Sequence, residues 1–229
     1  MTEEISFADL MAFSIHDMKN FVNVHLSELE IIALQAQACG DFDTFKSLMG
    51  VIGQTHRMSA HLIQLQAIHK FGQSIYPIDI AEQSVSDIID DVLSQTRFIL
   101  EFDGIHVEVE CEPDCYWNFD RELVTGVLLN AVNNAFHYTR DKIRVTANIA
   151  NGLLTLRVED NGSGFPASML HDVEIHTEKG VNFISGSTGL GFYFSLQVAR
   201  MHLSNGIRGT LAIENGGAYG GGCFVAKLP

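Results

Sequence analysis

Three short segments in the second half of the chain combine polar side chains and glycines in a way that suits a bound nucleotide. The first is a predicted helix on which Asn130, Asn134 and Tyr138 follow at intervals of four residues, with His137 beside them, so that they share one face. An asparagine oxygen is a hard ligand, suited to Mg²⁺ that bridges phosphate groups. The same asparagines could instead hydrogen-bond neighbouring loops, and this helix alone leaves both interpretations open.

The second segment is the turn Asp160-Asn161-Gly162-Ser163-Gly164, which follows a predicted strand. Asp160 continues the alternation of the buried strand residues, so its carboxylate should be buried and should need hydrogen-bond donors. The exocyclic amine of adenine is such a donor, reached directly or through a water, and the backbone of its own turn is the alternative. Gly162 and Gly164 would let the turn approach a ligand closely or adopt positive φ.

The third segment, Thr188-Gly189-Leu190-Gly191, runs directly into the last predicted helix, 188–202. A helix N-terminus presents free N–H groups and the positive end of the helix dipole, and both favour phosphate. The glycines keep side chains out of the approach path. Taken in order, the three segments predict one pocket for ATP with Mg²⁺.

A fourth group, His16-Asp17-Met18-Lys19-Asn20, lies on a predicted helix far upstream. His16 is next to the apolar stripe of that helix rather than in it, so its ring should be solvated. The chain has ten histidines, and an exposed histidine alone would mean little. Asp17 can hold the imidazole in its nucleophilic tautomer or accept its proton, and Asn20, one turn further on, can orient a water. An ATP pocket and such a histidine together predict phosphate transfer from ATP to His16.

Two long helices should carry this histidine, because residues 6–72 contain no proline. Their apolar stripes comprise Phe7, Met11, Ile15, Met18, Val22, Leu26, Leu29 and Ala33 in the first, and Leu48, Ile52, Thr55, Ser59, Leu62 and Leu65 in the second. Between them, Gly40 is expected at the position after the first helix and Asp43 as the N-cap of the second. Two helices cannot bury both stripes well, so we expect a homodimer that forms a four-helix bundle.

A linker is predicted at 73–83 and an α/β domain at 84–229. We expect a helix from Ser84 or Ser86 to about Leu100, a strand at 105–111, and a helix capped by Asp120 that ends near Tyr138. Residues 165–187 lack periodicity and predict a functional or mobile loop. Strands near 210–214 and 223–228 follow the last helix.

Asn151-Gly152 is the strongest local signal in this domain, because this dipeptide favours a two-residue hairpin turn. Pairing outward from the turn places Ile149 opposite Leu154, Ala147 opposite Leu156 and Val145 opposite Val158. All six side chains then fall on one face, which fixes the register.

Composition narrows the class of protein. The 229 residues carry a formal net charge of −14, which argues against a nucleic-acid partner or an anionic membrane surface. No stretch approaches the length of apolar sequence that a membrane span needs, and the acidic start is unlike a signal peptide, so a cytoplasmic protein without membrane insertion is expected. The four cysteines lack the spacing of a metal site or disulfide framework.

The order and spacing of these segments resemble two-component sensor histidine kinases. The stretch 129–139 is similar to the N box of that family, 159–166 to its first glycine box, 187–195 to its second, and 220–224 to its closing glycine strand. His16-Asp17-Met18-Lys19-Asn20 resembles the H box. The resemblance implies a helical hairpin that dimerises into a four-helix bundle, followed by a two-layer α/β sandwich with a mixed sheet, three helices and a lid at 165–187.

The resemblance also implies roles for individual residues. Asn134 would be the Mg²⁺ ligand, Asp160 the adenine anchor, Asp17 the general base, and Asn20 the residue that assists dephosphorylation of a partner. The expected function is ATP-dependent autophosphorylation of His16, phosphoryl transfer to the aspartate of a separate response regulator receiver domain, and phosphatase activity toward it. Because the hairpin starts close to Met1, input is expected from a separate sensory protein, or the segment is part of something longer.

Two other functions fit parts of the sequence. A phosphotransfer hub could share the hairpin and the ATPase fold while having lost nucleotide binding, although the full set of Asn134, Asp160 and glycines favours an enzyme. A serine-directed kinase or another ATPase could share the nucleotide domain without using His16.

Overall fold

The structure is a computed structural model that describes residues 7–72, 76–170 and 189–229. The chain divides into two compact units, residues 1–76 and 77–229. The boundary between them falls inside the stretch 73–83, where the sequence predicts a linker. Across the described ranges, no helix combines the length and the apolar character that crossing a membrane requires.

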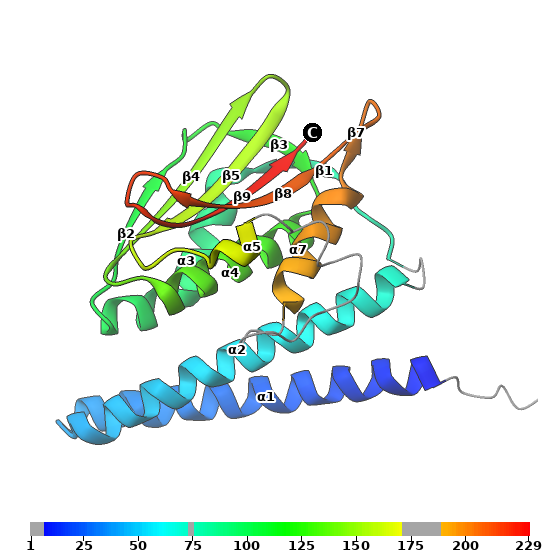
Figure 1. Cartoon of the computed structure of the whole chain (residues 1–229). Helices are drawn as coiled ribbons and strands as arrows, with labels where there is room; N and C mark the ends of the chain where they lie inside the picture. Colours follow the sequence, from blue (N-terminus) through cyan, green and yellow to red (C-terminus); the bar gives the residue numbers. More distant parts are fainter. Residues whose placement is uncertain (1–6, 73–75, 171–188) are drawn as a thin grey trace, which may run out of the picture. The chain divides into compact units, whose positions relative to one another are not determined.

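The N-terminal unit is a pair of long antiparallel helices, α1 (Phe7–Ala38) and α2 (Phe42–Gly72) (Figure 1). Gly40 lies between them with a φ of 76°, the left-handed conformation predicted for it. The prediction that Asp43 caps α2 is wrong. The helix starts two residues earlier than this cap implies, at Phe42, and Asp41 is the cap, because its Oδ1 accepts the Thr44 N–H at 3.1 Å. Asp43 lies in the first turn instead, where its charge still favours the helix dipole.

Apolar side chains along one face of each helix form the core of this hairpin. Those buried are Ile15, Val22 and Ala33 from α1 and Phe45, Met49, Ile52 and Ala67 from α2. Met18 belongs to the apolar stripe predicted for α1, but it is 46% exposed and lies outside this core. Many large apolar side chains stay exposed on the single hairpin, namely Phe13, Phe21, Val24, Ile31, Ile32, Leu34, Phe42, Val51, Met58, Ile63 and Leu65.

The C-terminal unit is a two-layer sandwich, as the sequence predicts. Its main sheet has the order β2-β4-β5-β9-β8, and it is mixed because β2 runs parallel to β4 while the other pairs are antiparallel. These strands are β2 (His106–Glu110), β4 (Lys142–Ala150), β5 (Leu153–Asp160), β8 (Thr210–Gly216) and β9 (Gly221–Leu228). The helices α3 (Val85–Phe102), α4 (Arg121–Tyr138) and α7 (Leu190–Met201) cover one face of the sheet (Figure 1).

The β4–β5 hairpin has the register that Asn151-Gly152 predicts. Both turn residues have positive φ, 54° for Asn151 and 74° for Gly152. The pairs are Ile149 with Leu154, Ala147 with Leu156 and Val145 with Val158. Leu154, Leu156 and Val158 are at most 2% exposed, whereas Ile149 near the tip is 42% exposed. This alternation carries on to Asp160 at the end of β5, so its side chain belongs to the buried face.

Several short elements were not expected from the sequence. They are β1 (Ala81–Ser84) paired with β3 (Tyr116–Phe119), β6 (Leu203–Ser204) paired with β7 (Ile207–Arg208), and the single-turn helix α5 (Ala167–Leu170). Strands of two to four residues are too short to show a period of two. Ser84 caps α3, because its Oγ accepts the Asp87 N–H at 3.2 Å.

His202, at the C-terminal end of α7, joins two of the helices from inside the domain. It is 1% exposed. Its Nε2 accepts the Asp120 N–H at 3.1 Å, and its Nδ1 lies 2.8 Å from the Val198 carbonyl oxygen, so Nδ1 carries the proton. Asp120 in turn caps α4 through Leu123 N–H and accepts the Asp79 N–H. Burial lowers the pKa of His202, because a charged imidazole would lose water there.

This arrangement predicts acid sensitivity of the C-terminal unit. The pKa of His202 is lower in the folded protein than its ordinary value of about 6.5, so the unfolded chain binds the proton more readily. The free energy of unfolding should therefore fall as the pH drops below about 6.5 and should be fully restored above it. Urea unfolding at about pH 7.5 and about pH 5.5 measures this. The His202→Gln variant should lose part of the pH dependence, and an equal dependence in both proteins would contradict the assignment.

Candidate functional site

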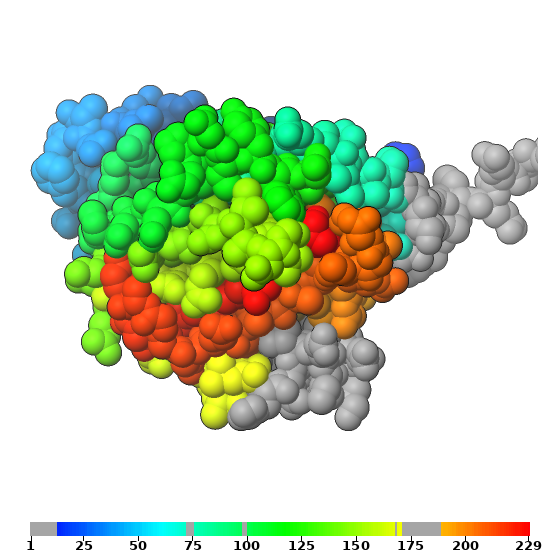
Figure 2. Space-filling view, turned by 90° about the horizontal axis from the view of Figure 1, so that it is seen from above, coloured from blue at the N-terminus to red at the C-terminus, as the bar shows by residue number. Residues whose placement is uncertain are grey.

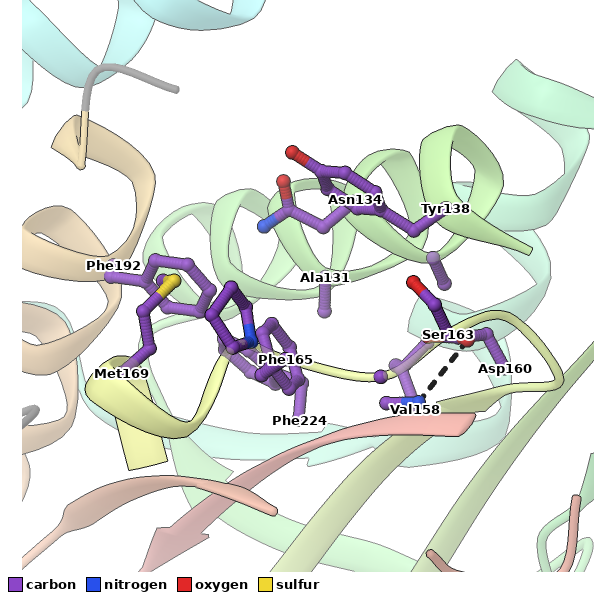
Figure 3. Close-up of a pocket in the computed structure, with 14 residues that line it drawn as sticks. Ala131, Asn134, Tyr138, Val158, Asp160, Ser163, Phe165, Met169, Phe192 and Phe224 are labelled. Atoms are coloured by element: carbon purple, nitrogen blue, oxygen red, sulfur yellow. Dashed lines mark hydrogen bonds between the residues drawn. The ribbon is translucent and has the colours of Figure 1, made fainter. Parts of the chain in front are cut away.

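A cavity of about 280 Å³ lies between α4, the end of β5, the start of β9 and the first turn of α7. Its wall is mainly apolar, with a few polar side chains at one side (Figure 3). This is the usual composition of a small-molecule site, in which apolar surface supplies affinity and a few polar groups fix orientation.

Helix α4 contributes Asn134 and Tyr138 to the cavity wall. Asp120 sets where this helix starts, so the interval of four residues brings both side chains to the same face, as predicted (Figure 3). The small residues Ala131 and Ala135 line the cavity between them and leave its volume open. His137 is exposed and rests against the Tyr138 ring, with ring centroids 4.8 Å apart, outside the lining residues.

Asp160 is the buried carboxylate of the cavity. It is 6% exposed, and its Oδ1 accepts the Gly162 N–H at 2.7 Å and the Gly222 N–H at 3.1 Å. The structural role considered for this residue, bonding to its own turn, is therefore present. Both bonds end on Oδ1, and no described residue donates a hydrogen bond to Oδ2. A second oxygen thus remains to accept a bond from a ligand in the cavity.

The glycines of the turn after β5 are required by close packing. A Cβ on Gly162 would fall 1.9 Å from the Tyr138 carbonyl oxygen, so only glycine lets the turn lie against the end of α4. Gly164 lines the cavity with a φ of 77°. Beyond it, Asn215 on β8 holds the turn in place, because its Oδ1 accepts the Phe165 N–H at 2.6 Å and its Nδ2 donates to the Phe165 carbonyl at 2.8 Å. Asn215 was not singled out from the sequence.

Three phenylalanines form the apolar end of the cavity. Phe165 meets Phe192 edge to face with centroids 5.9 Å apart, and Phe192 stacks on Phe224 at 6.2 Å (Figure 3). Flat rings of this kind suit the faces of a planar heterocycle such as a purine. This cluster was not predicted from the sequence, although the place of Phe224 could have been. It lies directly opposite Val158 in the register, and that position points to the same face as Asp160.

The glycine segment before α7 is only partly described, since Thr188 lies outside the described residues. Gly189 is the N-cap of α7, with a φ of 61°, and within the described part of the chain no side chain caps this helix. The N–H groups of a first helical turn have no partner inside the helix and can bind a ligand. A Cβ on Gly191 would fall 2.0 Å from Asn130 Oδ1. Gly189, Leu190 and Gly191 do not line the cavity themselves, but the next residue, Phe192, does.

Asn130 has a different place from the one predicted for it. It is 8% exposed, its Nδ2 donates to Ser195 Oγ at 3.2 Å, and it does not line the cavity. The amide therefore ties α4 to α7 behind the cavity. The predicted set divides into lining residues, which are Asn134, Tyr138, Asp160 and Gly164, and residues that pack the walls together, which are Asn130, Gly162 and Gly191.

On α1, His16 is exposed with two polar neighbours on its Nδ1 side. Asp17 Oδ1 and Asn20 Nδ2 each lie 3.4 Å from His16 Nδ1. The two contacts need opposite tautomers: Asp17 accepts a bond when Nδ1 carries the proton, and Asn20 donates one when Nδ1 is unprotonated. With Asp17 engaged, the lone pair is on Nε2.

The side chains around the cavity decide whether Mg²⁺ could be held there. Within the described ranges, no three His, Cys, Asp or Glu side chains are grouped as a metal site. Mg²⁺ held by the phosphates of a nucleotide needs only one or two protein oxygens, and its other ligands are phosphate and water. The amide oxygen of Asn134, at the cavity wall, fits that requirement.

Comparisons with known proteins agree with this geometry. Residues 119–229 match the family described as Histidine kinase-, DNA gyrase B-, and HSP90-like ATPase. Signal transduction histidine-protein kinase AfsQ2 of Streptomyces coelicolor is 24% identical over 181 residues, which are 78% of this chain and 32% of that protein. Sensor protein kinase WalK of Staphylococcus haemolyticus is 28% identical over 114 residues, 47% of this chain and 17% of that protein. The chain thus spans less than a third of the length of these relatives.

Solved structures share the fold. The catalytic domain of histidine kinase ThkA superposes with a TM-score of 0.57 at 21% identity, over 66% of this chain and 97% of that one. The Acinetobacter baumannii histidine kinase AdeS gives a TM-score of 0.59 at 18% identity, over 86% and 93% of the two chains. The expected fold, a helical hairpin followed by a mixed α/β sandwich, is therefore confirmed.

Proposed function

We propose that this chain is a two-component sensor histidine kinase that transfers the γ-phosphoryl group of ATP to His16 and then to the aspartate of a response regulator receiver domain. The ATPase family match over residues 119–229 and the similarity to histidine kinases support this proposal. The observation that carries the proposal is the cavity in which Asn134 and Asp160 lie on the wall beside the N-terminus of α7, which no side chain of the described residues caps. ATP needs three kinds of contact: a carboxylate oxygen for its amine, aromatic faces for its purine ring, and N–H groups for its phosphates.

Each part of the nucleotide has an assigned partner. The adenine amine donates to Asp160, and the ring lies against the phenylalanine cluster. The phosphates lie toward Gly189, Leu190 and Gly191, where helix N–H groups are available. Asn134 supplies the protein oxygen for Mg²⁺, which when bound neutralises phosphate charge and so favours transfer.

At His16 the chain supplies a nucleophile that is already oriented. Asp17 accepts the Nδ1–H, which leaves the Nε2 lone pair free to attack the γ-phosphorus. The bond from phosphorus to the β–γ bridging oxygen breaks and ADP leaves. Asp17 then takes the Nδ1 proton as the ring forms its new N–P bond, so charge does not accumulate on the imidazole.

The proposal includes three partners: a second copy of the chain, a receiver domain, and a source of sensory input. The exposed apolar side chains of α1 and α2 would be covered in a homodimeric four-helix bundle, in which two hairpins share one core. A receiver domain would take the phosphoryl group from His16, and a sensory protein or segment would supply the input. Phosphorylation of His16 and transfer to the receiver domain would both take place in the cytoplasm, where ATP is available.

Incubation of the full chain with Mg²⁺ and ATP labelled in the γ-phosphate tests this function. The expected result is label bound to the protein, with ADP as the other product. A protein that binds ATP but stays unlabelled would contradict the kinase. A protein that binds neither ATP nor ADP in the presence of Mg²⁺ would favour the phosphotransfer hub instead.

The position of Asn20 predicts that a mutation there separates autophosphorylation from phosphatase activity. Its amide is one helical turn from His16, close enough to orient a water that attacks the phosphoaspartate of a receiver domain. Asn20→Ala should leave the rate of autophosphorylation within about threefold and lower the phosphatase rate by about tenfold or more. The measurement is loss of phosphate from a receiver domain that the wild-type protein phosphorylates. An unchanged phosphatase rate would remove this role from Asn20.

A further inference from the structure

Glu159, the residue before Asp160, is a buried carboxylate on the opposite face of β5. It is 4% exposed, and it pairs across the strands with Cys223 on β9. Successive strand residues point to opposite faces, so Glu159 points away from the cavity that Asp160 lines. A carboxylate buried on this face needs partners.

Three donors bind the Glu159 carboxylate. Its Oε1 accepts from Arg157 Nε at 3.1 Å and from the Cys223 thiol at 3.7 Å. Burial raises the pKa of that thiol to about 12, so the thiol keeps its proton and can donate. Oε2 accepts the Ala218 N–H at 3.1 Å. Gly217 lies so close that a Cβ there would be 2.8 Å from Oε1, at a φ of 64°.

Ala218 belongs to the connection between β8 and β9, which lies at the molecular surface (orange-red in Figure 2). The connection leads directly into β9, whose start forms part of the cavity wall: Gly222 N–H donates to Asp160 Oδ1 at 3.1 Å, and Gly222 lines the cavity. Gly221 packs equally closely, since a Cβ there would be 2.4 Å from the Asp160 carbonyl oxygen. Two adjacent carboxylates therefore hold neighbouring parts of one segment: Glu159 holds the connection through Ala218, and Asp160, on the other face of the sheet, holds the start of β9 through Gly222.

We propose that Glu159 is a positioning residue for nucleotide recognition, which fixes the β8–β9 connection so that the Gly222 N–H holds Asp160 in the orientation that reads the adenine amine. This inference rests on the proposed ATP site. With the connection fixed, Oδ1 stays engaged by Gly162 and Gly222, and Oδ2 remains the acceptor for the base. With it loose, the carboxylate can turn, and the selective contact weakens before the rest of the site does.

The decisive variant is Glu159→Gln, which keeps the shape of the side chain. Glutamine has one acceptor oxygen and one amide nitrogen, so it cannot accept from both Arg157 and Ala218. Glu214→Gln is the matched control: Glu214 lies 3.5 Å from the same Arg157 guanidinium and is 52% exposed, and its bond partner is not the β8–β9 connection. Each variant removes one negative charge that faces the Arg157 guanidinium.

The readout is the Kd of the full chain for Mg²⁺-ATP and for the Mg²⁺ complex of purine riboside triphosphate, which lacks the exocyclic amine. In Glu159→Gln we expect about tenfold weaker ATP binding, little change for the amine-free nucleotide, and hence a loss of selectivity. Glu214→Gln should match the wild type in both. A general structural role for Glu159 would instead weaken both nucleotides equally.

Unchanged selectivity in a folded Glu159→Gln protein, or an equal loss for both nucleotides, would overturn the inference while leaving the ATP site in place. Should Glu159→Gln fail to fold, Tyr219→Phe provides the test, because the Tyr219 hydroxyl ties the same connection to Glu108 on the surface of β2. A fall in selectivity in that variant supports the inference, and wild-type selectivity overturns it. A wild-type protein that binds no ATP refutes the proposed function itself, and this inference with it.

Discussion

Asp160→Asn should weaken the binding of Mg²⁺-ATP by roughly 3 kcal/mol, or about a hundredfold in Kd, and should reduce labelling of the protein accordingly. Asparagine keeps one acceptor oxygen, which can still receive the Gly162 and Gly222 N–H groups and preserve the turn. The other position then becomes an NH₂ group facing the adenine amine, so two donors meet and a buried donor is left without an acceptor. Titration calorimetry of the full chain measures the loss.

The fold should survive this change, because the two backbone bonds remain. Thermal unfolding should shift little, and circular dichroism should be unchanged. Asp114→Asn, an exposed aspartate in the β2–β3 connection, is the matched control and should bind ATP like the wild type. ATP affinity within about twofold of wild type in Asp160→Asn would remove Asp160 from the base-binding site.

His16→Gln should abolish incorporation of phosphate from ATP while leaving the Kd for ATP unchanged. Glutamine has a similar length and polarity but no ring nitrogen to attack phosphorus. Since His16 is exposed, its replacement should not unfold the hairpin. Phosphate on the protein, measured with labelled ATP, should fall to background.

His25→Gln provides a close control on the same helix. His25 is also exposed and also has a carboxylate beside Nδ1, with Glu28 Oε2 at 3.4 Å. One turn further along the helix it has Leu29, where His16 has Asn20. This variant should label like the wild type. Label that persists in His16→Gln and disappears in His25→Gln would move the acceptor to His25, and label that persists in both would favour a kinase directed at another residue type.

The sequence was most informative where one local rule decides the structure. Asn151-Gly152 requires positive φ at both positions, and this turn, together with six apolar side chains on one face, fixed the strand register residue by residue. That register places Asp160 on the buried face without the need for any tertiary contact. The N-cap at Asp120 and the spacing of Asn134 and Tyr138 are equally local. The structure has this cap, and Asn134 and Tyr138 both line the cavity.

Features that depend on contacts between distant segments were not accessible. Asn130 and Asn134 have the same residue type and lie on the same helix face, yet one bonds Ser195 behind the cavity and the other lines it. Only the position of α7 decides between these places. Asn215 holds Phe165 across 50 residues of sequence. The cap of α2 was missed for a smaller reason, because Asp41 and Asp43 both suit the position and differ by two residues.

The chemical stability and location of the bound phosphate test the central claim most directly. The full chain, labelled from ATP in the presence of Mg²⁺, should carry phosphate that is lost in acid and retained in alkali, and mass spectrometry under neutral conditions should place it on His16. Phosphate that withstands acid, as on serine or threonine, or phosphate located elsewhere in the chain, would contradict the account.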